Sequence, residues 1–137
     1  MRFDEMAPGT AAEFAKTVTE ADVVLFAGVT GDFNPVHVDA VAAERSRFGG
    51  RIAHGMLSAS FISTVLGTRL PGPGTVYLSQ TLRFTAPVRI GDTVTARVEV
   101  AEATAAKRRV RLTTTCRNQR GETVVEGEAL VYVPEEA

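Results

Sequence analysis

The chain has 137 residues, of which 45% are hydrophobic and 23% charged, as in an ordinary globular domain large enough to bury a core. The formal net charge of −1 argues against a nucleic-acid binder, which usually carries a basic face. No apolar run approaches the roughly 20 residues of a membrane span, and the opening Met-Arg-Phe-Asp-Glu lacks the basic and apolar segments of a signal peptide, so we expect a cytoplasmic protein.

The first third of the chain predicts one strand and two helices. We expect a strand over residues 11–18 because its apolar side chains fall at alternate positions. Thr19 suits the N-cap of a following helix, since an acid stands at the third helical position as in a capping box, and Gly31 suits the helix end. A second, short helix is expected to start at Asp39 as its N-cap and to stop at residues 49–50.

The third predicted helix spans residues 55–69 and differs from the others. It is apolar or small on every side apart from hydroxyl groups, and a helix without a polar face is predicted to be buried. Fifteen residues are too few to span a bilayer, so the helix is expected inside a folded domain. The Leu-Pro-Gly-Pro-Gly sequence at residues 70–74 ends it.

The second half of the chain is predicted to be β structure. Apolar side chains alternate in four runs, at residues 76–84, 94–100, 110–116 and 125–133. Period-two alternation between turns indicates antiparallel strands with one buried face, and the single cysteine, Cys116, is expected there as a small core residue. We therefore predict one α+β domain over residues 1–137, with an antiparallel sheet of four or five strands wrapped around the long helix.

Residues 31–37 read Gly-Asp-Phe-Asn-Pro-Val-His and are the most informative segment of the chain for its function. Asp32 and His37 stand five positions apart, which is the wrong spacing for one helix face. Pro35 fixes its own φ and keeps Asn34 out of the helical region, so the segment should be an ordered turn. Such a turn can aim a carboxylate and an imidazole at one point, as acid–base catalysis requires. Alternatively, Asp32 only stops a helix or forms an Asx turn, and His37 is a surface residue.

Taken together with later segments, this turn resembles the MaoC-like (R)-specific enoyl-CoA hydratases of the hot-dog fold. The similar segments, which cover nearly the whole chain, are residues 25–39, 47–49, 52–57, 70–74, 84–88 and 91–94. The most specific part is the Asp-x-Asn-Pro-x-His turn followed by Phe-Gly and then by His-Gly-Met at the start of the long helix.

The resemblance implies an activity and a set of site residues. The family adds water reversibly, and in the syn sense, to a trans-2-enoyl thioester, giving the (R)-3-hydroxyacyl thioester. Asp32 and His37 match its catalytic pair, Gly55 matches the glycine whose N–H binds the thioester carbonyl, and Ser63 matches a helix serine near the catalytic acid. The resemblance also implies a homodimer that binds an acyl-CoA substrate and needs no cofactor, because coenzyme A is part of the substrate.

The chemistry of the residues agrees with such a reaction. Asp32 and His37 can hold one water between them, with Asp32 as the base and His37 as the group that orients it, or with the roles reversed, because a coupled pair titrates as a unit. Asn34 fixes the water or, as we favour, braces the turn. The first N–H groups of the long helix, from Gly55 on, lack intrahelical partners and attract negative charge, as an oxyanion site requires.

Other polar residues are weaker candidates. Ser63 lies about two turns beyond Gly55, but a serine in a buried helix usually bonds its own i−4 carbonyl. His54 stands at a helix start, where histidine is more often structural. Two histidines and no cysteine cluster argue against a zinc site, so no metal is expected. Candidate cations for the phosphates of coenzyme A are Arg45, Arg47, Arg51, Arg83 and the run Lys107-Arg108-Arg109.

Three other functions remain open. The chain could dehydrate acyl-carrier-protein thioesters in fatty-acid synthesis, which is the same chemistry in reverse. It could be a hot-dog thioesterase, although such enzymes place their acid on or beside the central helix, and residues 55–69 contain neither Asp nor Glu. It could also be a non-catalytic acyl-thioester-binding subunit, which the presence of both Asp32 and His37 argues against.

Overall fold

The computed structural model describes residues 1–135 and contains one five-stranded sheet with four α-helices and two 3-10 turns. No helix within these residues has the length and apolar character needed to cross a membrane. In chain order the elements are η1 (Phe3–Glu5), β1 (Ala11–Thr17), α1 (Glu20–Thr30), α2 (Pro35–Val38), α3 (Ala40–Glu44), α4 (Gly55–Thr68), β2 (Val76–Phe84), β3 (Thr93–Thr104), η2 (Ala105–Lys107), β4 (Arg109–Arg117) and β5 (Thr123–Tyr132).

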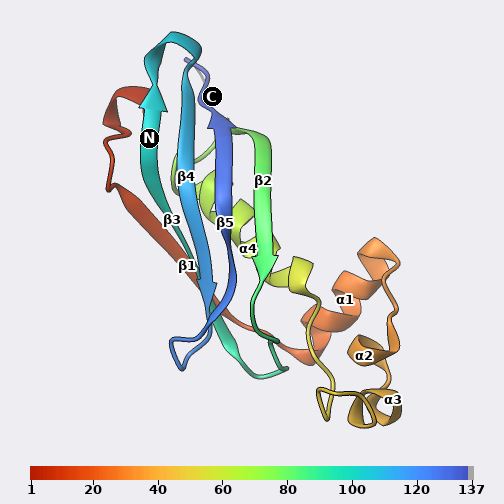
Figure 1. Ribbon diagram of the computed structural model, residues 1–137. Helices are drawn as coiled ribbons and strands as arrows, with labels where there is room; N and C mark the ends of the chain where they lie inside the picture. Colours follow the sequence, from red (N-terminus) through yellow and green to blue (C-terminus); the bar gives the residue numbers. More distant parts are fainter. Residues whose placement is uncertain (136–137) are drawn as a thin grey trace.

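The sheet is antiparallel throughout, with the strand order β1-β3-β4-β5-β2 (Figure 1). The long β3 lies between β1 and β4, and its residue Val98 pairs with Ala12 of β1 and with Thr114 of β4. β2 pairs only with β5 within the chain and so forms an edge. The α+β class and the antiparallel sheet predicted from the alternating runs are confirmed.

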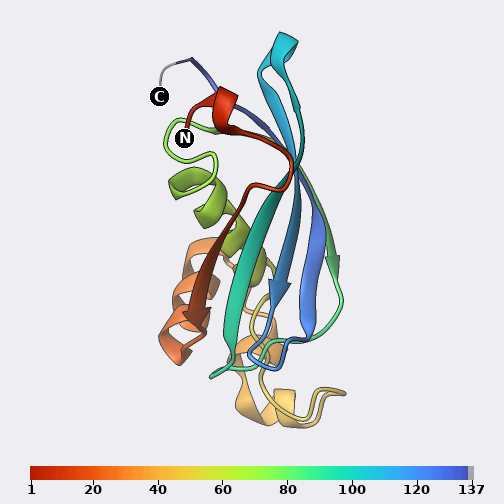
Figure 2. The ribbon, with the colours of Figure 1, turned by 90° about the vertical axis from the view of Figure 1, so that its left-hand side faces the viewer.

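The core lies between the sheet and α4, which crosses one face of β1, β3, β4 and β5 (Figure 2). Ile62 and Val65 on the helix are fully buried, as are Val98 and Leu112 on the strands. Burying each of these side chains contributes about 1.5–3 kcal/mol relative to an exposed position. The apolar composition of α4 therefore has its expected consequence on the side that faces the sheet.

The outer side of α4 departs from the prediction, because it is exposed in the single chain. Met56 is 52% exposed, and Ser60 and Ser63 on the same side are exposed as well. The sheet packs on the opposite side of α4, and on this side a hollow separates the helix from the edge strand β2. The apolar side chains of β2 are consequently uncovered too, with Val76 46% and Leu78 43% exposed.

Residues 18–54, which we call the connecting segment, lead from β1 to α4 and hold α1, α2 and α3 beyond the N-terminal end of α4 (Figure 1). Its helix ends follow the local sequence. Thr19 and Asp22 form the predicted capping box, Gly31 ends α1 with a φ of 81°, and Asp39 caps α3 by accepting from two backbone N–H groups.

Candidate active site

The turn that carries Asp32 is ordered by its own short hydrogen bonds. Asp32 Oδ1 accepts from the N–H of Asn34 at 3.1 Å, and Asn34 Oδ1 accepts from the N–H of Val36 at 3.2 Å. Asn34 has φ −51° and ψ 127°, the non-helical conformation expected before a proline, and Pro35 opens the single turn of α2. The Asn34 side chain thus stabilises the turn through its hydrogen bond to Val36. The Asp32 side chain is exposed.

His37, the next polar side chain of this turn, is buried at 8% exposure. Its Nδ1 lies 2.7 Å from the carbonyl oxygen of Ile52. Because a carbonyl can only accept, Nδ1 carries a proton, and in the neutral ring Nε2 then presents a bare lone pair. Arg51 holds the same turn by donating from Nε to the His37 carbonyl at 2.6 Å, and its other end pairs with both carboxylate oxygens of Glu20.

The predicted pair does converge. One side-chain ligand atom from each of Asp32, His37 and His54 lies within 4.8 Å of the other two. Two hydrogen bonds of about 2.8 Å to a shared water span up to about 5.6 Å. Asp32 and His37 are therefore close enough to hold one water between them.

The same spacing is also short enough for the three groups to surround a divalent cation. The sequence argument against a metal counted only histidines and cysteines, and it did not consider that Asp32 would join both histidines at one point.

The N-terminus of α4 opens into the cavity that contains this pair. The side chain of His54, the N-cap residue, makes no capping hydrogen bond, and while the N–H of Leu57 donates to the His54 carbonyl at 3.0 Å, the N–H groups of Gly55 and Met56 remain available to a ligand. Gly55 is closely approached: a Cβ added to it would lie 2.6 Å from the ring of Phe84. Any side chain at position 55 would therefore collide with Phe84 or with a ligand entering beside it.

The cavity has a volume of about 440 Å³, within the usual range for small-molecule sites. Its walls are largely apolar, and Val88, Val124 and Val125 on them are buried. It is lined by Asp32, His37, Arg47, Phe48, Ile52, Ala53, His54, Gly55, Met56, Ser58, Phe84, Thr85, Ala86, Pro87, Val88, Val124 and Val125. An apolar pocket with an acid, an imidazole and a helix N-terminus at one place suits an acyl thioester.

The candidate phosphate-binding cations separate in the structure. Arg47 lines the cavity with its guanidinium over the ring of Phe48 at 5.3 Å. Arg51 is already paired with Glu20. The basic run at residues 107–109 lies on the hairpin between β3 and β4, at the opposite end of the sheet from α2 and α3 (Figure 1). Arg47 is therefore the cation best placed to meet a ligand of this cavity.

Ser63 is not brought to the site within the chain. It lies on the exposed side of α4 and lines a separate hollow of about 310 Å³ between α4 and β2. Eight residues along an α-helix correspond to about 12 Å of rise, so Ser63 cannot share the end of the helix with Gly55. The implied contact between Ser63 and Asp32 is absent among the hydrogen bonds of residues 1–135.

His54 is the residue that sequence reasoning undervalued. It is 2% exposed, its Nε2 lies 2.9 Å from the carbonyl oxygen of Asp32, and its ring stacks on His37. The available signal was its position directly before Gly55, which places it where the turn and the helix must meet.

Cys116 behaves as the predicted core residue. It is fully buried, and its thiol donates to the carbonyl of Ser58 at 3.4 Å. Burial raises the pKa of the Cys116 thiol to about 12. The thiol is consequently unreactive at neutral pH and takes no part in the chemistry of the cavity.

Comparisons with known proteins point to one family. The model of the family described as MaoC like domain matches residues 4–122. An (R)-specific enoyl-CoA hydratase of Rhodospirillum rubrum is 54% identical over 132 residues, covering 96% of this chain and 91% of that protein. A 3-hydroxybutyryl-CoA dehydratase of Methylorubrum extorquens is also 54% identical, covering 96% and 83%. The unliganded structure of the R-hydratase PhaJ1 from Pseudomonas aeruginosa has a TM-score of 0.93 at 50% identity, covering 98% and 86%.

Proposed function

This chain belongs to the MaoC-like domain family, and from that premise we propose that it is an (R)-specific enoyl-CoA hydratase. The observation that carries the proposal is the convergence of Asp32, His37 and the N-terminus of α4 on one apolar cavity. Two relatives that are 54% identical over nearly the whole chain are named for the hydration of an enoyl-CoA or for its reverse.

The proposed reaction adds the elements of water across the Cα=Cβ bond of a trans-2-enoyl thioester. Asp32 and the bare Nε2 of His37 each accept a hydrogen bond from the reacting water. As the water oxygen bonds to Cβ, the pair takes one proton, and negative charge moves to the thioester oxygen. That charge is stabilised by the N–H of Gly55 and the dipole of α4. The proton then returns to Cα on the same face, which completes syn addition.

The proposal assigns the pair a joint role, because strongly coupled groups titrate together. With the proton of the neutral His37 ring on Nδ1, Nε2 orients the water by accepting from it, and Asp32 is our choice of base. Asn34 supports the turn. Both proton transfers are supplied by the chain, so we propose that no cofactor or metal is needed. Dialysis against EDTA is expected to leave the rate unchanged.

The direct test follows the enoyl-thioester absorbance after crotonyl-CoA is added. The chain should remove this absorbance and form the (R)-3-hydroxybutyryl thioester. Asp32→Asn keeps an oxygen that can accept from the N–H of Asn34, so it should fold normally and lose about 10³-fold in rate. If the wild-type chain leaves the absorbance unchanged and Asp32→Asn behaves identically, the proposal is wrong.

A thioesterase would instead release a free thiol, which Ellman's reagent detects. The assay is clean here because the one cysteine is buried with a pKa of about 12. The structure gives this alternative little support, since the described length of α4 carries no carboxylate. Supplying the acyl group on an acyl carrier protein in place of coenzyme A tests the dehydratase variant of the same chemistry.

We also propose that two copies of the chain pair through the β2 edge and the open side of α4, in the cytoplasm. The support is an unpaired edge strand whose Val76, Tyr77 and Leu78 are 40–46% exposed, beside the 310 Å³ hollow that contains Ser63. Analytical ultracentrifugation should give twice the chain mass, and Leu78→Asp should reduce it toward the monomer. An unchanged monomer in the wild type contradicts the pairing.

A further inference from the structure

We infer that His54 is a positioning residue of the site: a neutral imidazole, protonated at Nε2, that holds the Asp32 turn and the His37 ring in a fixed relation to the N-terminus of α4. The kinetic consequence of this inference rests on the proposed hydratase function. The protonation state of His54 and its effect on the order of the Asp32 turn do not depend on that function.

The protonation state of His54 follows from the surroundings of its two ring nitrogens. Nε2 of His54 lies 2.9 Å from the main-chain carbonyl oxygen of Asp32. A carbonyl oxygen only accepts, so Nε2 must donate and carries a proton. Nδ1 is buried without a hydrogen-bond partner, so a second proton there would bury an unpaired charge, and the ring is therefore neutral with Nδ1 bare. His37 is the reverse case, with its proton on Nδ1 facing the carbonyl of Ile52. The chain therefore holds its only two histidines as opposite tautomers.

Ring contacts hold the imidazole of His54 in place. The His37 ring stacks on it with centroids 3.9 Å apart and planes at 30°, and the ring of Phe26 from α1 lies at 4.9 Å with planes at 52°. With 2% exposure, the His54 ring has no room to turn into solvent. Its orientation is thus fixed by two neighbours, and it in turn supports one side of the His37 ring.

One side chain therefore joins the three parts of the site. His54 bonds the main chain at Asp32, stacks on His37 and is itself the residue before Gly55. Asp32 needs such support because its side chain is exposed and its turn is otherwise held by short local bonds. A misplacement of about 1 Å in a reacting group can cost about a hundredfold in rate.

The bare Nδ1 of His54 has a natural partner on the same helix face. Within residues 1–135, Nδ1 of His54 and Oγ of Ser58 are the two buried side-chain atoms that lack a hydrogen-bond partner. The residues are four apart, which places them on one side of α4, and both line the cavity. A water held between them would give both atoms a partner and keep Nδ1 unprotonated.

Nitrogen NMR tests the tautomers in the wild-type chain. With ¹⁵N-labelled histidine the spectrum contains four ring nitrogens, two from each residue, and His54→Gln assigns them by loss of one pair. At about pH 8.5, where free imidazole is neutral, His54 should show its proton on Nε2 and His37 its proton on Nδ1. A proton on Nδ1 of His54 overturns the inference.

Two variants separate the hydrogen bond from the packing. His54→Gln keeps a donor near the position of Nε2 but removes the ring, while His54→Phe keeps the ring and removes the donor. We expect His54→Phe to lower kcat about a hundredfold with KM changed less than about threefold, and His54→Gln to lose about tenfold or less. Amide exchange over residues 31–37 should be faster in His54→Phe than in His54→Gln.

Val23→Ala is the matched control, because Val23 is fully buried in α1 and does not line the active-site cavity. It should lower the melting temperature while kcat stays within about twofold. Full activity and normal exchange in His54→Phe would overturn the inference, because packing alone would then suffice. If the chain is not a hydratase, only the proposed function fails, and the nitrogen spectrum and the exchange rates still decide the role of His54.

Discussion

The sheet with α4 and the connecting segment of residues 18–54 are stabilised by different interactions. Between sheet and helix the buried side chains are almost all aliphatic, as with Val98, Leu112 and Ile62. In the connecting segment the residues of the candidate site are held by polar contacts to the main chain, such as those from His37 to Ile52 and from Arg51 to His37. Apolar packing is tolerant of small shifts, whereas a hydrogen bond to a carbonyl sets direction.

This division assigns stability and chemistry to different parts of the chain. Asp32 and His37 stand on the connecting segment, and α4 supplies only its N-terminus to the cavity. Substitutions between the sheet and α4 should therefore change the free energy of unfolding and leave kcat alone. Substitutions where the connecting segment meets the N-terminus of α4 should lower kcat and leave the free energy of unfolding nearly unchanged. The following predictions test that separation.

Ile62→Ala should have the largest effect. Ile62 is fully buried between α4 and the sheet and does not line the active-site cavity. The lost contacts and the cavity left behind should cost about 4 kcal/mol of unfolding free energy, measured by urea denaturation. The matched Ile62→Val should cost about 1 kcal/mol. A fall in kcat per folded molecule in either variant would break the separation.

Gly55→Ala should raise the activation free energy by about 3 kcal/mol, because the added methyl obstructs the approach of the thioester oxygen to the helix N-terminus. In the free chain the same methyl would meet the Phe84 ring at 2.6 Å. Phe84 is 51% exposed and can move aside, so the loss of stability should be small. Rates with crotonyl-CoA and melting curves measure the two effects.

The double variant Gly55→Ala/Phe84→Ala separates two explanations for that loss. If the methyl obstructs the substrate, removing the Phe84 ring should leave the rate low. If the rate returns to that of Phe84→Ala alone, the methyl acted only through the ring, and the assignment of Gly55 to the oxyanion site is wrong.

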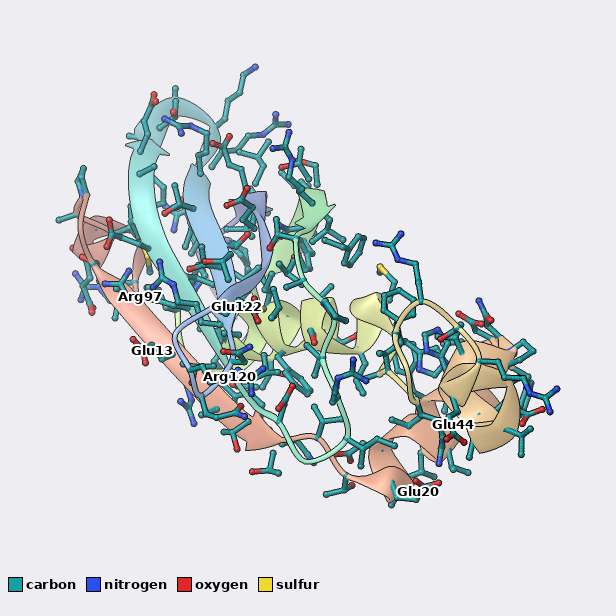
Figure 3. All side chains as sticks on the ribbon, turned by 60° about the horizontal axis from the view of Figure 1, so that its bottom comes forward. Glu13, Glu20, Glu44, Arg97, Arg120 and Glu122 are labelled. Atoms are coloured by element: carbon teal, nitrogen blue, oxygen red, sulfur yellow. The ribbon has the colours of Figure 1, made fainter. Side chains whose placement is uncertain are left out.

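Asp92→Asn probes a polar cluster that belongs to the sheet side. Burial raises the pKa of Asp92, but hydrogen bonds from Gln119 and the N–H of Arg89, together with the charge of Arg120, outweigh it and hold the pKa below its ordinary value. Arg120 lies on the turn between β4 and β5, next to Glu122 (Figure 3). The charged form is therefore favoured by folding.

The sign of the pH dependence follows from that lowered pKa. The stabilisation is complete above the ordinary carboxyl value of 3.8 and is lost as the pH falls through the native value. Asp92→Asn should cost about 2 kcal/mol of unfolding free energy at pH 7, and the difference from wild type should shrink as the pH falls below about 4. A constant difference down to pH 2 would contradict this assignment.

Features set by neighbouring residues could be predicted from the sequence. The alternation in the strands, the capping box at Thr19 and the end of α1 at Gly31 depend on side chains a few positions apart, so local patterns suffice. The convergence of Asp32 and His37 belongs to the same class, because both lie on one turn whose shape Pro35 restricts.

Features that depend on distant parts of the chain could not be predicted. The exposed side of α4 follows from the hollow between that side and the edge strand β2, which no helix composition reveals. The separation of Ser63 from Asp32 follows from where α4 points. The role of His54 needs the main chain at Asp32, which is 22 residues earlier, to return to the start of α4.

Thr19→Ala should have the smallest effect and tests the boundary between the two regions. Thr19 Oγ1 accepts from the N–H of Asp22 at 3.1 Å, and the Asp22 carboxylate accepts from the N–H of Thr19 and pairs with Lys16 of β1. Removing the cap should cost about 1 kcal/mol of unfolding free energy, while Thr19→Ser should restore most of it. The contacts of α1 with the site, which are the Phe26 ring on His54, the Glu20–Arg51 pair and the Thr30 hydroxyl that accepts from the N–H of Asp32, do not involve the cap itself, so kcat should stay within about twofold. A larger fall in kcat with Thr19→Ala than with the more destabilising Ile62→Ala would show that the start of α1 helps to order the catalytic turn. The whole connecting segment, from its first residue, would then contribute to catalysis.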